Sequence, residues 1–215
     1  MKRLSIIEKL FKSGKKENNE GSQLKFLDRH IDNSSIIMDY LVKTLTNIHE
    51  IDGREFEKFM NELFIFSGYD TNLTPPKGDG GIDLYVTKDN ITTAIQLKKR
   101  KLDSTSLIGV EEVRKLLGAI NIQDSKLQGA IITNHYYTEY AKEEAQKANI
   151  ELIDKEGLIT LISTLQPNIL AKVYYEKIIE PLGKCPKCGN INIYRYNPKI
   201  GKKYSLCIDY PKCKG

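Results

Sequence analysis

Residues 78–86 read Gly-Asp-Gly-Gly-Ile-Asp-Leu-Tyr-Val, and residues 94–98 read Ala-Ile-Gln-Leu-Lys. Apolar and polar side chains alternate in both stretches, which is typical of β-strands that bury one face. Between them, Asp89-Asn90 is a pair that tolerates the left-handed backbone of a two-residue hairpin turn. The two stretches are therefore predicted to form one β-hairpin, the element on which the rest of the fold depends.

The predicted hairpin brings polar side chains of different chemistry to one end of a sheet. Counting outward from the turn places Asp83 opposite Gln96. Lys98 shares the face of Gln96, about 7–8 Å from Asp83 at the backbone and within reach of a long side chain. The glycine-rich loop at residues 75–81 leads into this end and allows a ligand to approach closely. A carboxylate, an amide oxygen and an ammonium thus converge, although each residue alone is more simply a solvated strand residue.

The composition is that of a soluble globular protein. The chain has 215 residues, of which 40% are hydrophobic and 28% charged, with a net charge of +5. No apolar run reaches the roughly 18 residues of a membrane span, and no signal-peptide apolar block follows Met1. We therefore expect a cytoplasmic protein without a membrane partner. The net charge is modest, but basic residues crowd after Lys98 and near the C-terminus.

Helical and strand patterns alternate through the middle of the chain. The predicted elements are a helix at 52–64, a strand at 69–74, the hairpin, a helix at 110–120, a strand at 129–134, a helix at 139–148, a strand at 150–154 and a helix ending at 165. This order predicts an α/β fold in which helices flank a mixed sheet.

Glu57 lies at the edge of the apolar stripe of the helix at 52–64. Alone it reads as a surface residue. With Asp83 on an adjacent strand, it becomes a candidate second ligand for a metal ion or its water. The basic run Lys99, Arg100 and Lys101 follows directly after Lys98, and suits contacts to phosphates unless it is merely solvated.

The motifs together resemble the catalytic domain of Mrr-type restriction endonucleases, which have the restriction-endonuclease-like nuclease fold. The resemblance covers about residues 50–165 and rests on Phe56-Glu57, the glycine motif ending in Asp83, and Gln96-x-Lys98. The wider superfamily has a carboxylate where Gln96 stands. A glutamine at this position resembles the pattern of the Mrr branch. It removes one negative charge from the site.

The resemblance implies Mg²⁺-dependent hydrolysis of DNA phosphodiester bonds. Asp83, Gln96 and Glu57 would hold the Mg²⁺ ion, and Lys98 would orient the attacking water and stabilise charge on the phosphate. Asp79 is a weaker candidate for an outer-shell role. Because cutting both strands needs two active sites, we expect a homodimer.

All four cysteines lie near the C-terminus, as Cys185-x2-Cys188 and Cys207-x5-Cys213. Two such pairs in a reducing compartment are typical of a structural, tetrahedral Zn²⁺ site. Two disulfides and a redox pair are the alternatives. The reducing compartment argues against the disulfides, and a segment too small to fold around its own core argues against both.

The end of this segment, Cys-Ile-Asp-Tyr-Pro-Lys-Cys, is similar to the zinc ribbons of type IA topoisomerases, which bind single-stranded DNA. Arg195, Lys202, Lys203 and Tyr204 supply the charge and aromatic surface that such binding requires. A purely structural ribbon is the alternative.

The sequence therefore divides into four parts. They are an N-terminal helical region of unassigned role at 1–48, an Mrr-like catalytic domain at 49–166, a connecting helix at 167–182 and a zinc ribbon at 183–215. Beside a restriction-like DNA endonuclease, two alternatives remain open. One is a non-catalytic DNA-binding protein on a nuclease-like fold, and the other is a structure-selective DNA repair nuclease.

Overall fold

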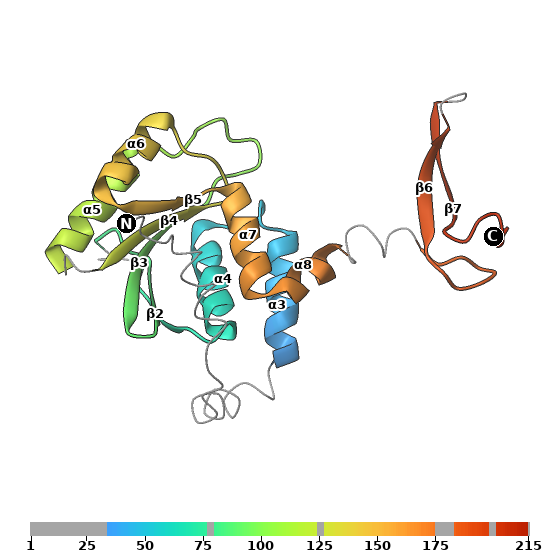
Figure 1. Ribbon diagram of the computed structural model, residues 1–215, viewed down its shortest axis with the longest axis horizontal. Helices are drawn as coiled ribbons and strands as arrows, with labels where there is room; N and C mark the ends of the chain where they lie inside the picture. Colours follow the sequence, from blue (N-terminus) through green and yellow to red (C-terminus); the bar gives the residue numbers. More distant parts are fainter. Residues whose placement is uncertain (1–33, 77–79, 124–126, 175–182, 198–200, 215) are drawn as a thin grey trace, which may run out of the picture. The chain divides into compact units, whose positions relative to one another are not determined.

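The computed structural model describes residues 34–76, 80–123, 127–174, 183–197 and 201–214. By its internal contacts the chain divides after Ile169 into two compact units. The first unit contains a five-stranded sheet in the order β1-β2-β3-β4-β5 (Figure 1). Its strands are β1 (Asp70–Leu73), β2 (Leu84–Lys88), β3 (Ile91–Lys98), β4 (Gln128–Thr133) and β5 (Ile150–Ile153).

The sheet is mixed, as the alternation of elements predicted. Strands β1, β2 and β3 pair antiparallel, whereas β3, β4 and β5 pair parallel. Strand β4 is nearly continuous in apolar residues because helices cover both of its faces. Strand β3 joins the antiparallel and parallel halves, and it carries Gln96 and Lys98 near its end.

The β2–β3 hairpin has the predicted register. Asp89 and Asn90 form the turn with φ values of 51° and 61°, and Lys88 pairs with Ile91. The ladder runs back to the pair Leu84–Ile95. Just before β2, the backbone N–H of Asp83 donates to the Ile95 carbonyl at 2.9 Å, so Asp83 lies at the level of Gln96. The position of Asp83 predicted from the sequence is confirmed.

Helices cover both faces of the sheet (Figure 1). Helices α5 and α6 pack against each other and against β4 and β5, while α4 packs on β1, β2 and β3 and also contacts α7. The helices of this part of the chain are α3 (Ser34–Thr46), α4 (Gly53–Phe66), α5 (Val110–Gln123), α6 (Glu139–Ala148), α7 (Lys155–Leu165) and α8 (Pro167–Tyr174). Between the sheet and the α5–α6 layer lies a buried core that includes Ile82, Ala94 and Ile131.

Local side-chain chemistry fixes where the helices begin. Asp52 caps α4 by accepting from the Glu55 N–H at 2.8 Å, and Thr138 caps α6 by accepting from the Ala141 N–H at 3.1 Å. Such a cap satisfies one of the free N–H groups of the first turn. The range predicted for α6 and its Thr138 cap are both confirmed.

Helix α4 is anchored by a stripe of fully buried side chains, as its periodicity predicted. The stripe consists of Phe56, Phe59, Met60, Leu63 and Phe64. Burial of each of these side chains contributes about 1.5–3 kcal/mol to the stability of the fold. This anchoring fixes the position of Glu57, which follows Phe56 along the chain.

The second unit contains a two-stranded antiparallel sheet of β6 (Asn192–Asn197) and β7 (Lys202–Cys207). Helix α8 spans the point where the two units divide. Residues 175–182 of the predicted connecting helix, and residues 1–33 of the N-terminal region, lie outside the described residues. Among the described helices, none is long and apolar enough to cross a membrane.

Candidate active site and candidate metal centre

Asp83 is held at the head of β2 by hydrogen bonds to its carboxylate. Its Oδ2 atom accepts from the Leu97 backbone N–H at 2.6 Å and from the Gln96 amide Nε2 at 3.5 Å. The residue is 6% exposed. A buried carboxylate needs such donors because desolvation penalises its charge. The Asp83 side chain is therefore fixed beside the end of β3.

Gln96 presents a side-chain oxygen that accepts no hydrogen bond within the described part of the chain. The residue is 1% exposed, and its Oε1 atom is buried without a hydrogen-bond partner among the described residues. Leaving a buried acceptor unpaired costs about 1–3 kcal/mol. An amide oxygen beside a carboxylate is a donor set that Mg²⁺ accepts, and a bound cation would satisfy the Gln96 oxygen. The residues present thus fit a magnesium ion.

Lys98 lies on the same face of β3 as Gln96, two residues further along the strand. Its Nζ atom is 3.0 Å from Oε2 of Glu112, in the first turn of α5. Because the Gln96 side chain reaches Asp83, all three of the residues predicted to converge lie on one side of the sheet. The Glu112 partner was not predicted.

Glu57 is joined to the Asp83 backbone through two other residues. Its Oε2 atom is 2.6 Å from Nη1 of Arg54, which also donates to the Thr74 carbonyl at 3.0 Å. The Thr74 hydroxyl in turn contacts the Asp83 carbonyl at 2.9 Å. Helix α4 therefore brings Glu57 to the segment that precedes Asp83, with its charge balanced by Arg54.

The loop that leads to Asp83 is only partly described. Asp79 lies outside the described residues. Gly81 has φ of 102°, and a Cβ atom there would lie 3.0 Å from the Lys115 side chain of α5. The glycine is needed both for its backbone conformation and for the space that Lys115 occupies.

The basic run after Lys98 borders a surface pocket of about 500 Å³. The pocket is lined by Lys99, Arg100, Lys101, Asp103, Ser104, Thr105 and Ser106. Lys99 donates its Nζ to the His49 carbonyl at 2.8 Å, which draws its charge toward the protein. Arg100 and Lys101 are the other cations of the pocket.

Residues 99–106, most of which line this pocket, form a basic loop. Asn134, which follows β4, holds the start of the basic loop in place. The Arg100 backbone N–H donates to Oδ1 of Asn134 at 2.7 Å, and the Asn134 amide donates back to the Arg100 carbonyl at 2.8 Å. Asn134 is 4% exposed. Sequence analysis did not single out Asn134 because the bonded residues are 34 positions apart. The predicted strand at 129–134 ended with this asparagine, and a polar residue at the end of a buried strand was the signal available.

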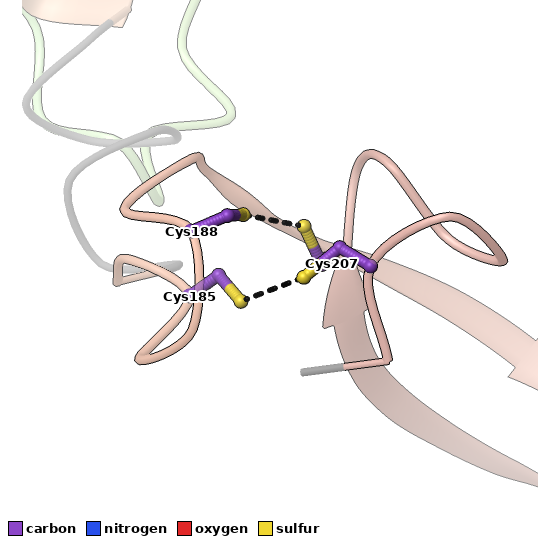
Figure 2. Close-up of side chains that lie close together, drawn as sticks. Cys185, Cys188 and Cys207 are labelled. Atoms are coloured by element: carbon purple, nitrogen blue, oxygen red, sulfur yellow. Dashed lines mark hydrogen bonds between the residues drawn. The ribbon is translucent and has the colours of Figure 1, made fainter.

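The four cysteines of the second unit form one cluster. Their sulfur atoms all lie within 4.8 Å of one another, and it is the only group of three or more metal-ligating side chains found within the described ranges. Figure 2 shows the side chain of Cys188 directed toward Cys207. The sulfur atoms of Cys185 and Cys213 are 3.6 Å apart, and those of Cys188 and Cys207 are 3.4 Å apart. Four sulfurs at about 2.3 Å from a central zinc ion lie about 3.8 Å apart. The cluster is compatible with a zinc ribbon.

The environment of the cysteines differs within the cluster. The backbone N–H groups of Cys188 and Lys187 lower the pKa of Cys185 to about 7. The Asp209 backbone N–H lowers the pKa of Cys207, but burial and the neighbouring thiols outweigh it and raise that pKa to about 12. A bound divalent cation would favour the thiolate form of these cysteines against the effect of burial.

The residues predicted to bind DNA in this unit lie on its two strands. Arg195 of β6 pairs with Tyr204 of β7, and Lys202 and Lys203 begin β7. Tyr204 is 45% exposed. The strand register therefore brings Arg195 beside an exposed aromatic residue.

The nuclease-like part of the chain matches a known family. A sequence model of a restriction endonuclease family, the Mrr catalytic domain, matches residues 48–162. The match contains every residue of the candidate active site.

The C-terminal region is similar to part of a much longer protein. It is 49% identical over 47 residues to DNA topoisomerase 1 of Pyrococcus horikoshii. The match covers 20% of this chain and 7% of the topoisomerase, so the chain spans only a small part of that relative.

Two solved restriction endonucleases show weaker structural similarity. The DNA modification-dependent restriction endonuclease AspBHI has a TM-score of 0.41 and 18% identity, covering 64% of this chain and 40% of that chain. MspJI restriction endonuclease, solved in complex with a 27-mer oligonucleotide, has a TM-score of 0.35 and 13% identity, covering 82% of this chain and 39% of that chain. Similarity at this level does not bear on individual site residues.

Proposed function

Because this chain belongs to the restriction endonuclease family defined by the Mrr catalytic domain, we propose that it is a Mg²⁺-dependent DNA endonuclease with a zinc-ribbon DNA-binding tail. The observation that carries the proposal is the contact of the Gln96 amide nitrogen with Asp83, which leaves the Gln96 oxygen without a partner among the described residues, on the face of the sheet that bears Lys98. A carboxylate and an amide oxygen can hold a divalent ion, and an ammonium can stabilise charge on a phosphate, so together they suit metal-assisted phosphodiester hydrolysis.

Three side chains would hold the magnesium ion in this proposal. Asp83 and Gln96 supply one carboxylate and one neutral oxygen, and Glu57 supplies a second carboxylate through a bound water. A magnesium ion here would polarise the phosphate and acidify a bound water. The hydrogen bond from the Leu97 N–H keeps Asp83 aimed at this position before DNA arrives.

Lys98 would orient the attacking water and stabilise the negative charge that builds up on the phosphoryl oxygens. Fixed cations of this kind act where charge develops in the transition state. Its position two residues beyond Gln96 places the ammonium on the side of the sheet where Asp83 lies.

The basic loop of the first unit and the tail would each contact DNA. Lys99, Arg100 and Lys101 would contact phosphates beside the scissile bond, which adds affinity without reading sequence. In the tail, Cys185, Cys188, Cys207 and Cys213 would hold Zn²⁺. Arg195, Lys202, Lys203 and Tyr204 would contact the strand through charge and stacking.

A second candidate is a nuclease that acts on DNA with single-stranded segments, such as a repair nuclease for junctions or flaps. The similarity of the tail to part of a DNA topoisomerase favours it. A homodimer would supply two active sites for cutting both strands, and we propose it as the active form on duplex DNA.

A cleavage assay tests the proposal and separates these candidates. Wild-type protein with Mg²⁺ is incubated with plasmid, modified-base plasmid, flap and junction DNA, beside the variants Asp83→Ala and Lys98→Ala. We expect cutting by the wild type on at least one substrate, and none by either variant. A wild-type protein that binds these substrates but never cuts them would leave a DNA-binding protein without nuclease activity.

A further inference from the structure

Helix α5 presents a carboxylate to the proposed catalytic lysine. Oε2 of Glu112 lies 3.0 Å from Nζ of Lys98, and the two side chains are 18% and 24% exposed. One turn further along, Lys115 packs over Gly81 in the loop that leads to Asp83. Residues three apart on a helix share a face. This face of α5 therefore borders the site in two places.

The first turn of α5 is firmly held, so the Glu112 carboxylate has a defined position. Val113 and Leu116 are fully buried in the core. The segment just before the helix is fixed as well, because the Ile108 N–H donates to the Tyr136 carbonyl at 2.9 Å and Ile108 accepts from Thr138 at 3.0 Å. A helix N-terminus also favours a negative charge in its first turn.

The contact contributes little to folding, which points to a role at the site. A single, partly exposed ion pair contributes only about 0–1 kcal/mol to stability. Lysine, by contrast, has a flexible stem and a compact charge that needs a partner to fix its direction.

We propose that Glu112 is a positioning residue, which holds the Lys98 ammonium toward the scissile phosphate. This role rests on the proposed nuclease function. Glu112 acts only through Lys98 and makes no contact of its own with the reacting atoms. Its loss should therefore lower the rate of the chemical step and leave DNA affinity nearly unchanged.

The test compares Glu112→Gln and Glu112→Asp with Glu111→Gln, an exposed neighbour that loses the same charge. Single-turnover cleavage is measured with Mg²⁺, and DNA affinity is measured with Ca²⁺. We expect Glu112→Gln to cut about 100-fold more slowly, as misplacement of a catalytic group does. Its Kd and Tm should match those of Glu111→Gln, and Glu112→Asp should recover part of the rate. Equal rates for Glu112→Gln and wild type, or a parallel loss of affinity and Tm, would overturn the role.

A second measurement does not depend on cleavage. Acetylation of Lys98 by a dilute N-hydroxysuccinimide ester is followed by peptide mass spectrometry. Glu112→Gln removes the ion-pair partner of Lys98, so the labelling rate of Lys98 should rise about fivefold. A change of this size corresponds to an ion pair at the upper end of the stability range for surface pairs. Glu111→Gln should leave it unchanged. Unchanged labelling in Glu112→Gln would refute the contact whether or not the protein cuts DNA. Absence of wild-type cleavage would instead remove the nuclease proposal, and the labelling alone would then show whether Glu112 orders Lys98.

Discussion

The Asp83 carboxylate accepts a hydrogen bond from the Leu97 backbone N–H at 2.6 Å, which ties the end of β3 to the residue that precedes β2. Asn at position 83 keeps an oxygen that can accept this bond but loses the charge. We therefore expect Asp83→Asn to lower the free energy of unfolding by only about 1–2 kcal/mol, because a neutral acceptor bonds more weakly. Cleavage should fall at least about 100-fold, since a ligand charge is gone.

Chemical denaturation and a Mg²⁺ cleavage assay check both effects of Asp83→Asn, with Asp70→Asn, a change at an exposed residue of β1, as the control. Retained cleavage in Asp83→Asn would remove Asp83 from the proposed metal site. A large loss of stability would show that its charge serves folding.

Glu57→Gln tests the second carboxylate. The Arg54 guanidinium contacts the Glu57 carboxylate at 2.6 Å, which holds that side chain in place near the segment that precedes Asp83. We expect the Mg²⁺ concentration for half-maximal cleavage to rise about tenfold, as for other groups that support metal ligands. The rate at saturating Mg²⁺ is measured in the same titration. Glu50→Gln, an exposed change of equal charge, should behave as wild type. A Mg²⁺ dependence that Glu57→Gln leaves unchanged would argue against the assignment.

Asn134→Ala should free the basic loop from β4. The substitution removes two hydrogen bonds to the Arg100 backbone, at 2.7 and 2.8 Å. We expect a loss of about 1–3 kcal/mol in stability and faster hydrogen exchange at the Arg100 amide. DNA affinity should weaken as the loop cations lose their fixed position. Hydrogen exchange read by mass spectrometry compares this variant with Asn72→Ala, which changes an exposed asparagine of β1. Equal exchange in the two variants would contradict the pinning role.

Zinc removal should affect the second unit selectively. We expect one zinc ion per chain in the purified protein and none in Cys188→Ser, since a tetrahedral site needs all four ligands. The first unit should keep its melting transition, while the transition of the ribbon disappears, because small metal sites fold with their ion. Elemental analysis and calorimetry provide the measurement, with Ser205→Ala as a control in β7. Full zinc occupancy in Cys188→Ser would refute the four-cysteine site.

Tyr137 should make stability fall at alkaline pH. Its hydroxyl donates to the Ile131 carbonyl at 2.8 Å, and burial, with a smaller effect of Asp154, raises its pKa above the ordinary value near 10. The contribution of Tyr137 to the free energy of unfolding is therefore complete below about pH 10. It is lost above that value, as the Tyr137 phenol of the unfolded chain ionises. Tyr137→Phe should be about 1–2 kcal/mol less stable at pH 7.

The gap in unfolding free energy between wild type and Tyr137→Phe should narrow between pH 10 and 11.5, by up to about 1.4 kcal/mol per pH unit. Urea titrations across this range supply the measurement. Tyr40, whose pKa is also raised by burial and by Glu55, remains in both proteins and cancels from the comparison. A constant gap would show that Tyr137 ionises equally in the folded and unfolded chains.

Local sequence signals predicted much of the fold. The Asp89-Asn90 turn set the hairpin register, which placed Asp83 beside Gln96. The Thr138 cap marked the start of α6, and the apolar stripe marked α4. Each of these features depends on residues close in sequence, where turn chemistry and side-chain periodicity decide the outcome.

Contacts between distant elements were not predicted. The Lys98–Glu112 pair joins a strand to a helix, and Asn134 reaches the Arg100 backbone across 34 positions. Arg54 appeared in the sequence as a helix residue, yet it connects Glu57 to Thr74. Such contacts depend on how helices are rotated against the sheet, and this rotation is set by core packing rather than by any local pattern.

The two-residue turn at Asp89-Asn90 has a further consequence for how the protein tolerates change. Because successive strand residues point to opposite faces, deleting a single turn residue and slipping the pairing by one would exchange the two sides of β3. Gln96 and Lys98 would then point away from Asp83, although no side chain of the proposed site had been altered. Loss of two residues, by contrast, would preserve the facing. The proposed site should therefore survive a change of turn length by an even number of residues better than a change by an odd number of residues.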